Sequence, residues 1–139
     1  MIRKILLGYD GSASATDAFT FALDLAQRYQ AELHVIAVSR PPEFAEDVET
    51  EAILENSRRH YEEVLKPVQA RVAATKLRTR FEIVVGHPAE QIVRYAEGHG
   101  VDHIVVGHRG RTLFERFLIG SVARQVIAYA HCAVTVVRT

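Results

Sequence analysis

Short apolar runs alternate along the chain with longer segments whose apolar residues recur every three or four positions. The first run, residues 3–9, leads into a segment with helical spacing that ends near residue 30. The same reading predicts further strands at 32–38, 78–85, 102–106 and 133–137. Helices are predicted from about Asp47 to Thr75, from Pro88 to Gly98 or Gly100, and from about Gly120 to Ala130. This alternation is typical of an α/β protein, a parallel sheet covered by helices on both faces.

The long stretch from Asp47 to Thr75 has an apolar stripe that predicts one buried helix face. Its expected buried residues are Ile53, Tyr61, Val64, Leu65, Val68 and Val72. Pro67 lies inside the stretch, so we expect it to kink or split the helix. Before the preceding helix, near residue 13, Ser12 or Ser14 can serve as the N-cap.

Length, charge and cysteine usage narrow the class of protein. The 139 residues predict a single domain, residues 1–139, with 48% hydrophobic and 24% charged residues. Lys plus Arg and Asp plus Glu both number 17, and this zero net charge argues against a general nucleic-acid binder. No apolar run is long enough to predict a membrane span. The single cysteine, Cys132, excludes an intrachain disulfide and favours a reducing compartment, by default the cytoplasm.

A glycine-rich segment follows the apolar run Ile104–Val106. It reads Gly107-His-Arg-Gly110, then nine residues, then Gly120-Ser121, where a helix is predicted to begin. Glycines after a strand let the backbone approach a ligand, and the N–H groups of a helix N-terminus favour an anion, here the phosphate chain of a nucleotide. The alternative is a purely structural loop, since turns need glycine for conformational reasons. Neither the Walker A pattern nor Gly-x-Gly-x-x-Gly is present, which excludes an ordinary P-loop NTPase and a dinucleotide site.

Asp10 follows the first predicted strand, in the sequence Asp10-Gly-Ser12. Its carboxylate could hold a ribose hydroxyl or a divalent cation that bridges phosphates, and the alternative is a turn-capping aspartate. Ligands of such sheets bind at the carboxyl ends of the strands. If the first and fourth strands are neighbours, Asp10 and the segment 107–121 share one crevice, and His108 and Arg109 could offset phosphate charge.

Signatures of catalysis and of a structural metal are missing from the sequence. The seven histidines have no zinc-type spacing, no Gly-x-Ser-x-Gly elbow occurs, and no carboxylate pair stands out. Cys132, just before a buried strand, is interpreted as a small core residue. The sequence therefore predicts nucleotide binding without an assigned catalytic residue.

These motifs together resemble the universal stress protein A family over essentially the whole chain. The resemblance rests on Ile5–Ser12, Gly86–Ile92, Asp102–Gly110, Gly120–Ala123 and His131–Val137. The full loop, Gly-x2-Gly-x9-Gly-Ser, is similar to that of the ATP-binding members. The resemblance implies an open five-stranded parallel sheet in the order 3-2-1-4-5, a Rossmann-like fold of the adenine nucleotide alpha hydrolase type. One departure is Cys132-Ala133-Val134, where the family often has Cys-Pro-Val.

The resemblance also implies a nucleotide site. Asp10 would lie near the ribose and an accompanying Mg²⁺ or Mn²⁺, and the backbone around Val35 and Ile36 would contact adenine. The ribose and phosphates of ATP would be lined by Val106, Gly107, Arg109, Gly110, Gly120, Ser121 and Val122.

Family members are typically dimers through the last strand. Here residues 133–137 form an apolar strand without lysine or proline to protect its edge, so a homodimer is expected. The implied function is an ATP-dependent switch or regulator of a stress response, with slow or no turnover and an unidentified protein partner. Two alternatives remain: a slow ATPase or self-phosphorylating enzyme with Ser121 or a nearby hydroxyl as acceptor, and an interaction module with a vestigial pocket. The sequence leaves ATP, AMP, a cyclic nucleotide and other anions open.

Overall fold

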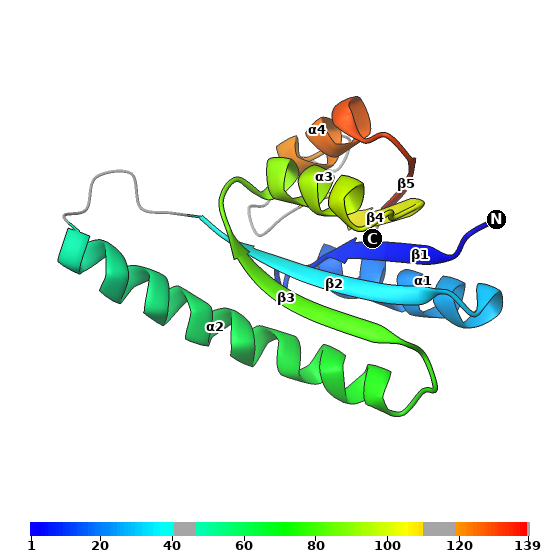
Figure 1. Ribbon diagram of the computed structural model, residues 1–139, viewed down its shortest axis with the longest axis horizontal. Helices are drawn as coiled ribbons and strands as arrows, with labels where there is room; N and C mark the ends of the chain where they lie inside the picture. Colours follow the sequence, from blue (N-terminus) through cyan, green and yellow to red (C-terminus); the bar gives the residue numbers. More distant parts are fainter. Residues whose placement is uncertain (41–46, 110–118, 139) are drawn as a thin grey trace.

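Five parallel strands form one sheet in the order β3-β2-β1-β4-β5 (Figure 1). The computed structural model describes residues 1–40, 47–109 and 119–138, with the backbone alone at 47–50. The strands are β1 (Lys4–Gly8), β2 (Glu32–Ser39), β3 (Thr79–Val85), β4 (His103–Gly107) and β5 (Ala133–Val137). The helices are α1 (Ala13–Tyr29), α2 (Asp47–Ala73), α3 (Pro88–Gly98) and α4 (Ser121–Tyr129). The predicted fold class and strand order are confirmed.

The winding direction of the sheet reverses between β1 and β4. From β1 the chain crosses through α1 to β2 on one side, whereas β4 pairs with β1 on its other side. Leu6 of β1 is aligned with His34 of β2 and with Ile104 of β4. The first and fourth strands are therefore neighbours, and their carboxyl ends open a crevice of the kind in which such sheets bind ligands.

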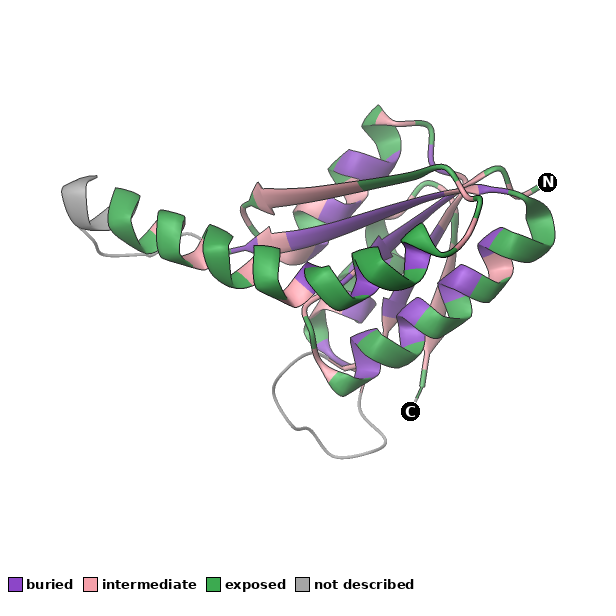
Figure 2. Ribbon diagram, turned by 90° about the horizontal axis from the view of Figure 1, so that it is seen from below, coloured by how far each residue is buried: buried purple, intermediate pink, exposed green. Residues whose placement is uncertain are grey.

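Each face of the sheet has its own apolar core. Successive strand residues point to opposite faces, so Leu7, Val35 and Val105 pack with α1 and α2, whereas Leu6, Ile36 and Ile104 pack with α3 and α4. Figure 2 shows this division as buried central strands, with partly exposed strands at the sheet edges, between helices whose outer faces are exposed. The sheet is thus held between two helical layers, and its carboxyl-end edge is left to the loops.

Local sequence explains where α1 begins and ends. The Ser12 side chain accepts a hydrogen bond from the Ala15 N–H at 3.1 Å, so Ser12, and not Ser14, is the N-cap. At the other end Gln30 adopts a left-handed conformation, with φ of 54°, and its N–H bonds to the Ala26 carbonyl. The short turn before α1 therefore places the end of β1 directly beside the start of the helix.

Helix α2 continues through Pro67 and leaves one residue of the predicted buried face exposed. Pro67 does not split it, because the residue lies on the exposed side, where water can satisfy the carbonyl that a proline leaves unpaired. Leu65, Val68 and Val72 are buried as expected, but Ile53 is 45% exposed because the first half of α2 extends past the strands (Figure 1). Neither α2, the longest helix at 27 residues, nor any other helix in the described ranges has the apolar stretch needed to cross a bilayer.

Candidate functional site

A pocket of about 630 Å³ lies at the carboxyl ends of β1, β2 and β4, where the winding direction of the sheet reverses. Helix α4 closes it on one side with its N-terminus, and α2 and α3 supply further walls. The residues around it are Gly8, Tyr9, Asp10, Ala15, Ile36, Val38, Arg40, Ser57, Tyr61, Pro88, Ile92, Val106, Gly107, His108, Arg109, Gly120, Ser121, Val122 and Ala123. Apolar side chains from the strands thus meet polar groups from the loops and helix ends.

Asp10 is both a turn residue and a pocket residue. Its Oδ1 accepts the Ser12 N–H at 2.9 Å, which is the turn-capping role that the sequence left open. Gly11 has φ of +82°, a conformation that favours glycine. Because the turn fixes the carboxylate at the pocket edge, Asp10 can also offer an oxygen to a ribose hydroxyl or a metal ion.

The N-terminus of α4 presents backbone donors to the pocket. Gly120 is the N-cap with extended backbone, and within the described part of the chain no side chain caps this helix end. The N–H groups of Ser121, Val122 and Ala123, in the first turn of α4, have no partner within the helix, and all three residues line the pocket. Together with the positive end of the helix dipole, they form a seat for an anion.

His108 organises the base of the glycine-rich segment. Its carbonyl accepts the Gly120 N–H at 2.7 Å, which ties the end of β4 to the start of α4. Its own N–H donates to the Val137 carbonyl of β5 at 2.9 Å. The imidazole is buried, with Nδ1 3.4 Å from Ser14 Oγ, so His108 anchors the end of β4 to α1 and does not project into solvent.

Among the residues that the structure describes, the charged groups of the pocket are Asp10, Arg40 and Arg109. The two guanidinium groups offer positive charge to phosphates, which a guanidinium can bind through two parallel hydrogen bonds. In the ranges that the structure describes, no three His, Cys, Asp or Glu side chains gather into a metal site. A Mg²⁺ or Mn²⁺ ion at Asp10 would accordingly need phosphate and water oxygens as its other ligands, the arrangement common for Mg²⁺ beside nucleotides.

Most of the predicted site residues lie together around this pocket. Asp10, Ile36, Val106, Gly107, Arg109, Gly120, Ser121 and Val122 all line it. The Val35 side chain belongs to the core on the opposite face of the sheet, beneath α1 and α2, so the contact with adenine predicted at this position involves its backbone alone. Gly110 falls outside the described residues.

Sequence reasoning missed several pocket residues. Arg40 directly follows β2, the same position at the carboxyl end of a strand that marked Asp10, so this signal could have found it. Pro88 and Ile92 begin α3, the helix after β3, and could be inferred in the same way. Ser57 and Tyr61 have no such signal, because only the packing of α2 against the sheet brings them to the pocket.

The fold is that of the universal stress proteins. The family model "Universal stress protein family" matches residues 1–138, so the chain belongs to this family. The chain is 35% identical over 141 residues to universal stress protein MJ0531 of Methanocaldococcus jannaschii, a match that covers 99% of this chain and 83% of that protein.

Solved structures show the same architecture. Universal stress protein UspA from Lactobacillus plantarum superposes with a TM-score of 0.88 at 31% identity, covering 98% of this chain and 97% of that one. The protein MJ0577 gives a TM-score of 0.77 at 27% identity, with coverage of 100% and 97%. Two more distant structures share the fold at 23% and 16% identity. One is a universal stress protein described in complex with cAMP, the other a family member from Arabidopsis thaliana described with AMP bound.

Proposed function

We propose that this universal stress protein binds ATP in the pocket between β1, β4 and the N-terminus of α4. The observation that carries the proposal is the convergence of Asp10, Gly107 and Ser121 on one cavity, although these residues are far apart in the sequence. Proteins of the same fold are described with AMP and with cAMP, which supports adenine nucleotides as the class of ligand.

The two ends of the pocket suit the two ends of a nucleotide. Ile36, Val38 and Ile92 offer an apolar surface for the base. The first N–H groups of α4 and the guanidinium of Arg109 offer donors for phosphates. The donors come from two places, the Arg109 side chain after β4 and the first N–H groups of α4, which provides for more than one phosphate and favours ATP over AMP.

We assign the accompanying Mg²⁺ or Mn²⁺ to Asp10. The ion would neutralise part of the phosphate charge, and the Asp10 carboxylate would hold it beside the ribose and the phosphates. The Ser12 N–H occupies one lone-pair direction of Oδ1 and thereby orients the carboxylate. The remaining acceptor capacity of Asp10 is then available to an ion.

The role we propose is a nucleotide-dependent switch or regulator in a stress response, with slow or no turnover. The described residues that line the pocket include no lysine and no acid–base pair set to activate a water molecule. Ser121 is exposed at the start of α4 beside the phosphate seat, so slow transfer of a phosphoryl group to its hydroxyl is the second candidate activity. Intact-mass measurement after incubation with ATP separates the two, because phosphorylation adds mass and a switch does not.

We further propose a homodimer formed through β5. This strand is the last in the sheet, and its outer edge has backbone groups that a second β5 could pair. On the neighbouring α4, Ile127 and Tyr129 are 50% and 73% exposed, which adds apolar surface near that edge. The single free thiol, Cys132, is compatible with a reducing compartment, and we place the protein in the cytoplasm.

The experiment that tests the binding proposal uses the purified protein without variants. Small molecules released on denaturation are identified by mass spectrometry, and ATP is titrated calorimetrically into ligand-free protein with Mg²⁺ or Mn²⁺. We expect an adenine nucleotide in the released fraction and saturable ATP binding. Absence of binding at millimolar ATP with both metals overturns the proposal and leaves the interaction module as the remaining alternative.

A further inference from the structure

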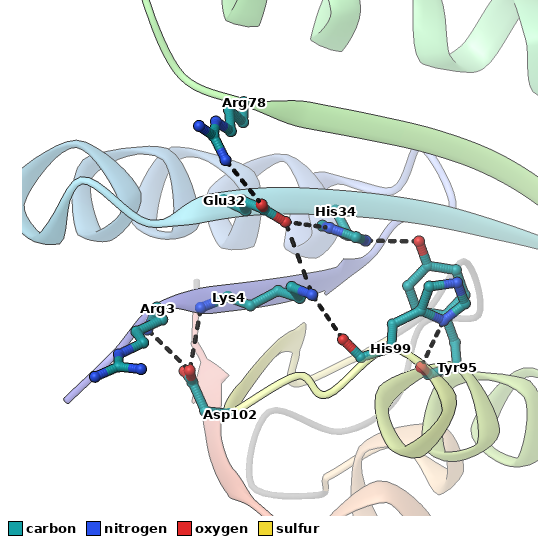
Figure 3. A network of polar contacts seen from close by, with 8 residues as sticks. All are labelled: Arg3, Lys4, Glu32, His34, Arg78, Tyr95, His99 and Asp102. Atoms are coloured by element: carbon teal, nitrogen blue, oxygen red, sulfur yellow. Dashed lines mark hydrogen bonds and ion pairs between the residues drawn. The ribbon is translucent and has the colours of Figure 1, made fainter.

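A polar cluster joins β2 to α3 on the face of the sheet that carries α3 and α4, toward the amino ends of the strands (Figure 3). His34 of β2 is buried, with its Nδ1 2.6 Å from the Tyr95 hydroxyl of α3 and its Nε2 3.1 Å from Glu32 Oε2. The Tyr95 ring stacks on the ring of His99, with centroids 3.8 Å apart. His34–Tyr95 is therefore a side-chain hydrogen bond between the sheet and the helix that covers it.

The partners of His34 decide which of its nitrogens holds the proton. The hydrogen bond from His34 is the main cause that lowers the pKa of Glu32, so this carboxylate is ionised near neutral pH and can only accept. Nε2 therefore donates its proton to Glu32, and Nδ1 accepts the Tyr95 O–H. Burial lowers the pKa of His34 below its ordinary value, which keeps the ring neutral in this arrangement.

The same two elements form part of the pocket wall. Ile36 lies two residues beyond His34 on the same face of β2, and Ile92 lies three residues before Tyr95 on α3. Both line the pocket. Ile92 also packs tightly on β1, because a Cβ added at Gly8 would lie 2.8 Å from Ile92 Cδ1. A change in the distance between β2 and α3 would therefore alter the pocket.

We propose that the His34–Tyr95 hydrogen bond is a positioning contact for the nucleotide pocket, and that a proton taken up at His34 Nδ1 weakens nucleotide binding. This inference rests on the proposed function. After protonation both ring nitrogens are donors, so the Tyr95 oxygen must accept from Nδ1 and the tyrosine proton loses its acceptor. Tyr95 is only 7% exposed, so water does not readily replace that acceptor. Relief then comes from movement of Tyr95 and α3, which carries Ile92 with it.

Other charged and titratable groups surround the pair. They come from β1, β2, β3, the residue before β3 and the residue after α3, namely Lys4, Glu32, Arg78, Arg80, Glu82 and His99. Lys4 Nζ donates to the His99 carbonyl at 2.8 Å and lies 3.9 Å from Glu32 Oε2. Glu32 favours the protonated imidazole, whereas burial and Lys4 oppose it, and the direction of the shift shows that opposition prevails.

Calorimetric titration of Mg²⁺–ATP at about pH 7.5 and about pH 5.5 tests the inference, with His34→Gln and Tyr95→Phe compared with wild type. The phosphates of ATP take up protons in the same way in every experiment, so only the difference in affinity between the proteins is interpreted. On acidification, the affinity of wild type for ATP should fall at least about fivefold more than the affinity of either variant. Both variants should also bind ATP less tightly than wild type at the higher pH, because each lacks the His34–Tyr95 hydrogen bond.

His103→Gln is the matched control. His103 is also partly buried with a lowered pKa, but it bonds to Thr135 on the face of the sheet that carries α1. Its variant should keep the pH dependence of wild type. If wild type and the His34 and Tyr95 variants share one pH profile, or if His103→Gln abolishes the dependence, the inference is wrong while the proposed function stands. If wild type does not bind ATP at the higher pH, both fall.

A second measurement avoids substitutions and any folding defect they cause. The His34 ring is titrated by NMR in wild-type protein with and without Mg²⁺–ATP at saturating concentration. Because linkage is reciprocal, a nucleotide that prefers the neutral ring must lower the pKa of His34 further. A pKa that nucleotide leaves unchanged or raises overturns the inference.

Discussion

Gly107 and Ser14 are in direct backbone contact, where the end of β4 crosses the first turn of α1. A Cβ built on Gly107 would lie 2.5 Å from Ser14 Oγ and 2.8 Å from the Ser14 carbonyl carbon. Ser14 Oγ also accepts the Arg109 N–H at 3.3 Å. Gly107 therefore lacks a side chain because α1 occupies that space, and this packing lets the start of the loop lie against the pocket.

Gly107→Ala should destabilise the protein by about 1–3 kcal/mol, because the new methyl group overlaps the Ser14 backbone, which cannot move without shifting α1. Urea unfolding followed by circular dichroism measures the loss. Gly98→Ala is the control: a Cβ there meets nothing within 4 Å, and alanine suits the helix better than glycine. Equal stability of the two variants would show that the contact with Ser14 is not tight.

Stability should fall on acidification from about pH 7.5 to about pH 5.5, because burial lowers the pKa of His34 and of His103. The unfolded chain, with ordinary histidine values near 6.5, then binds more protons than the folded chain, so acid favours unfolding. His34→Gln and His103→Gln should each reduce the pH dependence by up to about 1 kcal/mol. Urea midpoints at both pH values measure this change in stability. If both variants lose as much stability on acidification as wild type does, the two histidines are not its cause.

The proposed dimer predicts a particle of twice the 15.6 kDa chain mass in light scattering. Thr135 lies at the centre of β5, so Thr135→Lys would place two lysines side by side across a twofold axis and should yield monomers. Thr135→Val loses the same hydroxyl contact to His103, 2.6 Å long, but leaves the edge apolar. It should remain dimeric, and a monomeric wild type or a dimeric lysine variant would rule out pairing through this edge.

Asp10→Asn should weaken ATP binding in the presence of Mg²⁺ by about tenfold, because an amide oxygen is a poorer ligand for the ion than a carboxylate. The amide can still accept the Ser12 N–H, so stability should not change. Titrations with Mg²⁺ and with EDTA separate the metal effect from other losses. Asp24→Asn, which breaks only an exposed ion pair with Arg28, should bind as wild type does. A metal effect that persists in Asp10→Asn would place the ion elsewhere.

The hydrophobic pattern located the nine elements of the described residues to within about two residues, because each buried face imposes its own period on the sequence. The pattern was wrong at Ile53, because periodicity shows which side of a helix is apolar but not whether a sheet lies opposite that side. Whether Ser12 or Ser14 caps α1 depended on one hydrogen bond that spacing alone does not determine.

The candidate site was predictable where it is local in sequence. Asp10 and Gly107 each stand at the end of a strand, and the sheet order brings those ends together. Tyr61 and the His34–Tyr95 pair were not predictable, because they depend on how α2 and α3 pack on the sheet. Residues that lie apart in the sequence and meet only through packing leave no mark in a single sequence.

The central claim, a phosphate seat at the start of α4, is tested most directly by ATP titration of Ser121→Asp beside Ser121→Ala. The positive end of the helix dipole favours a carboxylate at this position, so α4 should keep its stability. The same carboxylate should repel a bound phosphate. Alanine keeps the backbone N–H groups and should retain binding within a few-fold. We expect at least about a hundredfold loss of affinity in Ser121→Asp, with an unfolding midpoint no lower than that of wild type. Wild-type affinity in the aspartate variant would show that no phosphate lies at this helix end.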